Sequence, residues 1–138
     1  MPLSDPMRQF LASVHPYDCL SEKDLQALAS ACSIEEASAG QTVFGFGDTV
    51  KNIYIIVSGE VEIRDEADVQ ISLLGSRNSF GERALTRGGI ATRTATATAD
   101  ANLIVIPSVT LFALIDRHPQ IARFFDRGRS ARPQTTDL

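Results

Sequence analysis

The chain has few of the residues on which catalysis, metal binding or disulfide bonding usually depends. It holds no tryptophan, two cysteines and two histidines in 138 residues. Cys19 and Cys32 are too few for a disulfide framework, and Cys32 falls on the apolar face of an expected helix, where we expect a buried thiol. His15 and His118 precede prolines near expected helix ends, whereas a metal-binding barrel needs a histidine pair in or beside a strand. We find no nucleophile or acid–base constellation either, so we expect no catalytic residues, no metal site and a protein that is not an enzyme.

Excess positive charge and long apolar runs are also missing. The net charge is −4, whereas a general nucleic-acid binder needs a basic stripe. The first fourteen residues lack the apolar core of a signal sequence, and no apolar run is long enough to span a bilayer. We therefore expect a cytoplasmic protein that contacts neither nucleic acid nor membrane.

The residues that are present follow the order helix, strands, helix in one domain. Residues 21–33 show helical spacing of apolar residues behind an expected N-cap, Ser21. From Gly40 onward, short runs rich in β-branched residues follow one another at roughly ten-residue spacing, which predicts a β sandwich or jelly roll. The dipeptide Ser58-Gly59 predicts a hairpin turn between two of these strands.

After the strands the pattern becomes helical again. Residues 108–119 begin with Ser108, an expected N-cap, and their apolar face comprises Val109, Phe112, Ala113 and Ile115. We expect Phe112 and Ile115 to pack against the open side of the barrel.

The stretch SFGERALTRGGIATRTATATA, residues 79–99, is the least ordinary part of the chain. Gly81 leads into one turn of good helix formers, and the free backbone N–H groups at a helix N-terminus favour an anion. Glu82 in that place has two interpretations. It is either a first-turn carboxylate favoured by the helix dipole by about 0.3–1 kcal/mol, or an acceptor for a ligand hydroxyl such as that of a ribose.

Threonine and alanine alternate in the second half of this stretch. The threonines at even positions 92–98 share one strand face, and Arg93 shares the other with the alanines at odd positions 91–99. The alanine face leaves space that a packed protein must fill. A helix, a ligand or large side chains of neighbouring strands, such as Phe44, Tyr54 and Phe80, would fill it. If this face points inward, Arg93 needs an anionic partner or a route to solvent.

Several motifs occur together in one known family. The chain carries G-x-x-apolar-x-x-x-G-D at Gly40–Asp48, YIIVSGEV at Tyr54–Val61 and FGERAL at Phe80–Leu85. With these spacings residues 10–126 resemble the cyclic-nucleotide-binding domain family, which includes catabolite-activator-type regulators, protein kinase A regulatory subunits and nucleotide-gated channels. The resemblance implies an eight-stranded β jelly roll flanked by helices. The segments expected from it are an N-terminal helical segment 1–34, a jelly roll 35–107 with a phosphate-binding cassette 80–94, C-terminal helices 108–128, and a linker or tail 129–138.

The family's cassette also implies the roles of individual residues. In it a glutamate binds the ribose 2′-hydroxyl and an arginine binds the cyclic phosphate, and the matching positions here are Glu82 and Ala91. Arg93 lies two residues further on, and it either replaces the missing arginine or closes the pocket with a salt bridge to Glu82. Arg83 and Arg87 are further candidates. The expected ligand-binding residues are Phe80, Gly81, Glu82, Arg83, Ala84, Ala91, Thr92 and Arg93.

These features predict a regulatory module that binds cyclic AMP, cyclic GMP or a related anionic ligand and carries no cofactor. The alternative is a ligand-free interaction or dimerisation module of the same fold within a larger signalling protein. A narrower resemblance, of residues 10–28 and 118–125 to a bacterial subgroup, implies that the chain precedes paired CBS domains and a nucleotidyltransferase-like domain. Residues 129–138 would then begin an interdomain linker.

Overall fold

The computed structural model describes residues 3–85 and 88–123 of the chain. The helices are α1 (Asp5–Ala12), the short 3-10 helix η1 (Tyr17–Cys19), α2 (Glu22–Ala31), α3 (Glu82–Leu85) and α4 (Ser108–Arg117). The strands are β1 (Ser33–Ala37), β2 (Thr42–Phe44), β3 (Asn52–Arg64), β4 (Gln70–Leu74), β5 (Ser79–Phe80) and β6 (Thr94–Pro107). Within the described residues, no helix is long and apolar enough to cross a membrane.

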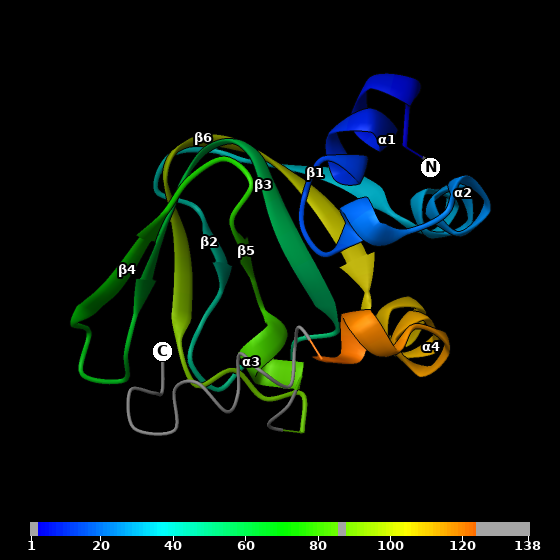
Figure 1. The fold of residues 1–138 in the computed structure, drawn as a ribbon. Coiled ribbons are helices and arrows are strands. Elements are labelled where there is room, and N and C mark those ends of the chain that lie inside the picture. The colour runs from blue at the N-terminus through cyan, green and yellow to red at the C-terminus, as the bar shows by residue number, and fades with distance from the viewer. Residues whose placement is uncertain (1–2, 86–87, 124–138) are drawn as a thin grey trace.

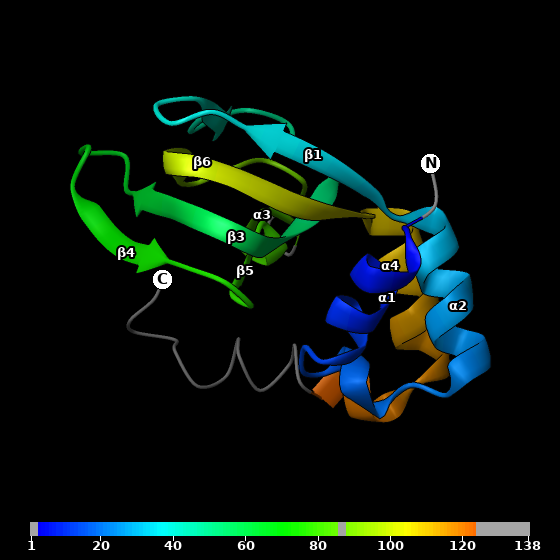
Figure 2. The same cartoon turned by 90° about the horizontal axis from the view of Figure 1, so that it is seen from above.

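The strands form an antiparallel sheet that curls into a barrel, with α1, α2 and α4 gathered at one end (Figures 1 and 2). β6 pairs with β1, β2 and β3, and β3 pairs with β4 and β5 as well. The expected fold class, a β jelly roll with flanking helices, is confirmed. The described residues form six strands rather than eight. The count is lower because β3, with 13 residues, and β6, with 14, each run without a break where two strands were expected.

Ser58 and Gly59 do not form the expected hairpin turn. They lie within β3, where the register with β6 shifts on both sides of Ser58. Gly59 has φ +98°, and a Cβ at this position would lie 2.4 Å from the carbonyl oxygen of Asp100 on β6. A glycine with positive φ suits a β-bulge as well as a turn, and here the strand continues through the irregularity.

The apolar core has two parts. One part joins the helices to the near half of the barrel and includes Leu11, Tyr17, Leu28, Ile53, Ile55, Ile104, Ile106, Leu111 and Leu114. The other part fills the barrel, where the Tyr54 and Phe80 rings stack at 5.1 Å. Phe44 approaches the same two rings at 6.1 Å and 5.9 Å between centroids. These three rings lie in one cluster with the buried alanines of β6, so large side chains of neighbouring strands fill the space over the alanine face.

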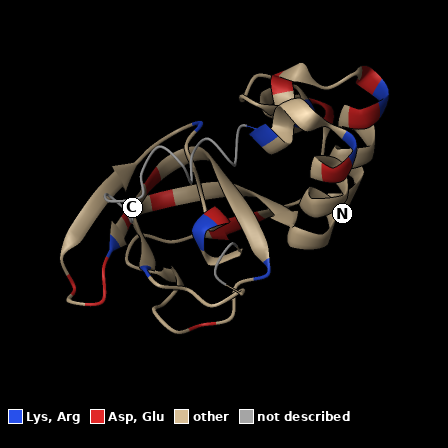
Figure 3. Cartoon of the chain, turned by 60° about the horizontal axis from the view of Figure 1, so that its bottom comes forward, with Lys and Arg blue, Asp and Glu red and all other residues tan. Residues whose placement is uncertain are grey.

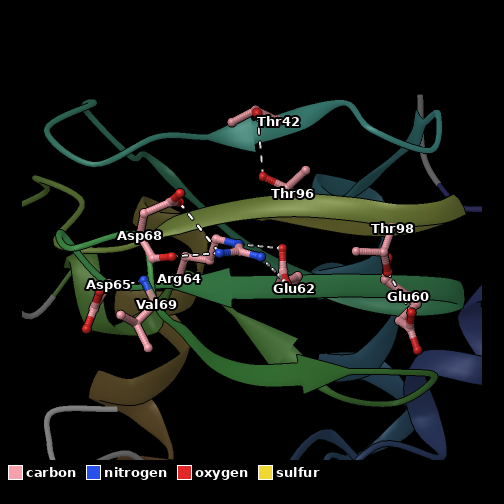
Figure 4. Close-up of polar contacts among 9 residues, drawn as sticks. All are labelled: Thr42, Glu60, Glu62, Arg64, Asp65, Asp68, Val69, Thr96 and Thr98. Atoms are coloured by element: carbon pink, nitrogen blue, oxygen red, sulfur yellow. Dashed lines mark hydrogen bonds and ion pairs between the residues drawn. The ribbon is translucent and has the colours of Figure 1, made fainter.

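The threonine side of β6 faces outward. Ala95 and Ala97 are fully buried, whereas Thr98 is exposed and its hydroxyl donates a 2.6 Å hydrogen bond to the Glu60 carboxylate (Figure 4). On the same face Arg64 donates two hydrogen bonds, of 2.8 Å and 3.0 Å, to the Glu62 carboxylate. The alternation predicted the two faces correctly as far as Ala97, and Ala99 is exposed near the bulge in β3.

The helices agree with the sequence in part. The Ser21 hydroxyl caps α2 and accepts a 3.2 Å hydrogen bond from the backbone of Asp24. Ser108 is not a capping residue, because the N-cap of α4 is Pro107, which makes no side-chain cap. The expected apolar face of α4 is wrong except at Ile115, which is half-buried and packs against the core beside the helices. Leu111 and Leu114 are buried, whereas Val109, Phe112 and Ala113 are exposed. Apolar residues occur on several sides of this helix, and the side that packs on the core is the one with Leu111 and Leu114 rather than the expected one.

Candidate ligand-binding site

The cassette begins where β5 leaves the sheet. Phe80 pairs with Tyr54 of β3, and Gly81 then turns the chain into α3. Gly81 has φ +103°, and a Cβ there would lie 2.9 Å from the carbonyl oxygen of Asn52. Glycine combines this φ with so close an approach to another backbone without strain. The turn therefore leads into α3, which carries Glu82 and Arg83 in consecutive positions. Figure 3 shows acidic and basic positions next to each other on a short helix beside the strands.

Glu82 is half-buried and has two neighbours that sequence reasoning did not identify. The Ser79 hydroxyl donates a hydrogen bond to one carboxylate oxygen of Glu82. Tyr17 of η1 is only 3% exposed. Burial raises the pKa of the Tyr17 phenol well above its ordinary value, and the negative charge of Glu82 raises it further. Glu82 thus acts electrostatically on the helical end of the molecule as well as on the barrel.

Arg83 ties α3 to the chain that enters β6. Its Nε donates a 3.2 Å hydrogen bond to the Thr92 hydroxyl. Ala84 and Ala91 are both buried, and the Ala84 carbonyl accepts a 2.8 Å hydrogen bond from the Gly89 backbone. The two ends of the cassette are therefore held next to each other, and Ala84 and Ala91 belong to the core cluster that fills the barrel.

A turn at residues 45–48 holds Ala91 in place. The Asp48 carboxylate accepts a 2.8 Å hydrogen bond from the Gly45 backbone N–H, which forms the turn. Ala91 donates its N–H to the Asp48 carbonyl and accepts from the Gly47 N–H, both at 2.8 Å. Gly47 and Asp48 of the G-D motif therefore position the cassette at Ala91. We had not counted Asp48 among the site residues, although that spacing was a signal for it.

Arg93 lies in the bend directly before β6 and is half-buried. Its Nε atom is buried, and Ala91 and Ala95, two residues away on either side, are 2% and 0% exposed. The buried Nε agrees with the expectation that Arg93 shares the alanine face, although the residue itself precedes β6. A guanidinium with a buried Nε needs an anionic or polar environment.

Two other cassette positions depart from the pattern that the resemblance implies, namely Arg83 in place of an aliphatic residue and Ile90 in place of a proline. Ile90, which replaces the usual proline, is 45% exposed and forms an isolated bridge with Thr49. Arg87, one of the further candidates for the phosphate, lies outside the described residues.

The histidines lie near helix ends, as expected. His118 is the C-cap of α4, and its Nε2 lies 3.2 Å from a carboxylate oxygen of Asp24. His15 lies in the turn between α1 and η1. The expectation of a buried thiol is confirmed: Cys32 is 2% exposed, and burial raises its pKa to about 12.

Comparison with known proteins supports the same interpretation of the fold. The sensor domain of the transcriptional regulator DNR from Pseudomonas aeruginosa superposes with a TM-score of 0.82 at 23% identity, over 93% of this chain and 94% of that one. The regulatory domain of Toxoplasma gondii PKA, crystallised with cAMP, superposes with a TM-score of 0.71 at 23% identity, over 80% of this chain and 45% of that one. At these identities the similarity shows the fold. Both structures are sensor or regulatory domains rather than catalytic ones.

The sequence relationship is more direct. The cGMP-dependent protein kinase of Plasmodium berghei is 36% identical over 80 residues, which make up 56% of this chain and 9% of that protein. The chain spans between 8% and 31% of the length of the first curated relatives it matches. The model of the cyclic nucleotide-binding domain covers residues 34–118. Because this match covers more than half of the 138 residues, the chain belongs to the cyclic nucleotide-binding domain family.

Proposed function

We propose that the chain is the sensor domain of a regulatory protein and binds a cyclic nucleotide in the cassette of residues 80–94. The observation that carries this proposal is the buried Nε of Arg93, two residues from Ala91, the position at which the resemblance implies a phosphate arginine. Membership of the family supports it. The names of the relatives also favour a cyclic nucleotide as the ligand class, since they include a cGMP-dependent kinase and a PKA regulatory domain crystallised with cAMP.

Glu82 is the proposed acceptor for the ribose 2′-hydroxyl. An ionised carboxylate accepts up to about four hydrogen bonds, and one oxygen of Glu82 accepts from the Ser79 hydroxyl. That bond also restricts the rotation of the Glu82 side chain. A preoriented acceptor loses less conformational entropy on binding than a mobile one.

Arg93 is the proposed partner of the cyclic phosphate. Two residues along a strand span roughly 6–7 Å, a distance that the long arginine side chain can cover toward the site next to Ala91. Arg83 is a further candidate, and its Nε donates to the Thr92 hydroxyl at 3.2 Å. A guanidinium donates in parallel to two phosphate oxygens, which gives orientation as well as energy.

Calorimetric titration with cyclic AMP and with cyclic GMP tests the proposal. We expect a single site of micromolar or better affinity for at least one of them. Glu82→Ala should weaken this affinity at least tenfold, since a hydrogen bond to a charged group contributes about 1.5–3 kcal/mol. The matched control is Glu66→Ala, because Glu66 is an exposed glutamate in the turn after β3, and its affinity should not change. An absence of heat with both nucleotides would contradict the proposal.

A second candidate function is a ligand-free interaction or dimerisation module, and one observation favours it. On α4, Val109 is 74% and Phe112 46% exposed. A groove of about 280 Å³ between α2 and α4 adjoins them and is lined by Leu28 and Leu114, among others. Light scattering across a range of concentrations would detect self-association, and Val109→Ser with Phe112→Ser should abolish it. Strong association without nucleotide binding would favour this candidate.

The domain is further proposed to act within a longer signalling protein. The small share of its curated relatives that the chain spans supports this. Following CBS and nucleotidyltransferase-like domains, which the narrower sequence resemblance implies, remain the proposed context. Co-purification of such domains on the same polypeptide from cells would test it.

A further inference from the structure

Three side chains with metal-binding atoms meet in the turn that joins α1 to α2. His15 Nδ1 lies 2.9 Å from a carboxylate oxygen of Asp18, and the Cys19 thiol lies 3.5 Å from the same oxygen. All three donor atoms lie within 4.8 Å of one another. We had not grouped these residues from the sequence, because His15 lies in no strand and its spacing to Asp18 and Cys19 matches no familiar metal motif.

The backbone beneath these side chains is well ordered by hydrogen bonds. The Asp18 N–H donates to the Val14 carbonyl and the Cys19 N–H to the Pro16 carbonyl, both at 3.1 Å. Val14 and Tyr17 are 5% and 3% exposed and anchor the turn in the core. A fixed backbone holds the three donors near one another without a bound ion, which lowers the entropic cost of ordering ligands on binding.

We propose that His15, Asp18 and Cys19 form a binding site for one divalent transition-metal ion of the zinc class. An imidazole, a carboxylate and a thiolate are three typical zinc ligands, and a thiolate disfavours calcium and magnesium, which prefer oxygen. Bond lengths of about 2.0–2.3 Å place tetrahedral ligand atoms roughly 3.3–3.7 Å apart, so small side-chain rotations suffice. The three side chains are exposed, which leaves a fourth position for water.

Metal binding requires the loss of protons at this site. The Cys19 thiol must give its proton to the buffer, and the imidazole must be neutral to offer a lone pair. Metal binding releases these protons to the solvent. The binding enthalpy should therefore depend on the ionisation enthalpy of the buffer.

Two measurements on the whole chain test the site. Calorimetric titration of the reduced, metal-free protein with Zn²⁺ should give one ion per chain with micromolar or tighter affinity. Titration with Co²⁺ should give the charge-transfer absorption of a cobalt–thiolate bond. Cys19→Ser should abolish that band and weaken Zn²⁺ binding at least tenfold, and His15→Ala should weaken binding by a similar factor.

His118→Ala is the matched control, since His118 is a helix-end histidine outside the cluster, and it should bind Zn²⁺ like the unaltered chain. Thermal unfolding without metal checks that each variant folds, which we expect for the changes at His15 and Cys19 because both side chains are exposed. Zn²⁺ affinity unchanged by Cys19→Ser would overturn the site, as would an absence of cobalt–thiolate absorption. One ion per two chains would also overturn it, since the ion would then bridge two copies.

Discussion

Replacing Arg93 by alanine removes the cation proposed for the cyclic phosphate and leaves the rest of the cassette intact. A hydrogen bond to a charged group contributes about 1.5–3 kcal/mol, which corresponds to about 10- to 150-fold in affinity. We expect a loss in the upper half of this range, because the Nε of Arg93 is buried and buried charges are screened less than exposed ones. Calorimetric titration with cyclic AMP or cyclic GMP, whichever binds more tightly, measures the loss.

Two further variants make this prediction specific. Arg93→Lys keeps the charge but loses the planar fork, so its affinity should fall between those of the unaltered chain and Arg93→Ala. Arg117→Ala, on the exposed end of α4 with a side chain 61% exposed, should leave affinity unchanged. Urea denaturation establishes that each variant folds. An affinity within twofold of the unaltered chain for Arg93→Ala would refute the phosphate role, and a higher affinity would show that Arg93 closes the pocket.

Three other predictions concern stability and thiol chemistry. Gly59→Ala should lower the free energy of unfolding by about 3 kcal/mol in urea denaturation, because the new Cβ would lie 2.4 Å from a backbone oxygen at φ +98°. Gly40→Ala, at φ +91° with nothing within 4 Å of the Cβ, should cost only about 1–2 kcal/mol; equal losses would contradict the bulge. An exposed Cys19 and a buried Cys32 predict that one thiol per native chain reacts with a disulfide reagent at pH 8, and rapid reaction of both would contradict this. The raised pKa of Tyr17, from an ordinary value of 10.0, means that the folded state holds its proton more tightly than the unfolded state. The free energy of unfolding should then fall by up to about 1.4 kcal/mol per pH unit above pH 10. In Tyr17→Phe the free energy of unfolding should no longer show this fall above pH 10. An equal fall in the variant would argue against Tyr17 as its cause.

Local patterns in the sequence predicted those helices and strands that have one buried and one exposed face. α2 has a capping serine and apolar residues at helical spacing. The alternation of threonine and alanine at the start of β6 predicted that the alanines face inward and the threonines outward. β1 was missed because its sequence, SIEEA, carries two glutamates and only one buried residue, Ala37. Gly59 was assigned to a turn because turns and bulges both use glycine at positive φ. Only the pairing of β3 with β6 shows that Gly59 lies in a bulge and not in a turn.

Much of the candidate site was also predictable from spacing. Phe80, Gly81 and Ala84 adopt the expected places because the turn at Gly81 and the packing of small residues are local requirements. The partners of Glu82 were not predictable. Tyr17 lies in another segment of the chain, and its position depends on how the helical end packs on the barrel. The cluster at residues 15–19 was missed for a related reason, since a tight turn brings together side chains that periodic patterns place apart.

The most direct test of the central claim is a crystal structure of the chain grown with cyclic AMP or cyclic GMP. We expect the nucleotide to lie in the cassette, with a phosphate oxygen about 2.7–3.2 Å from the guanidinium of Arg93. The ribose 2′-hydroxyl should donate a hydrogen bond to the Glu82 carboxylate. A nucleotide bound elsewhere on the chain, or one bound in the cassette with its phosphate away from Arg93, would contradict it.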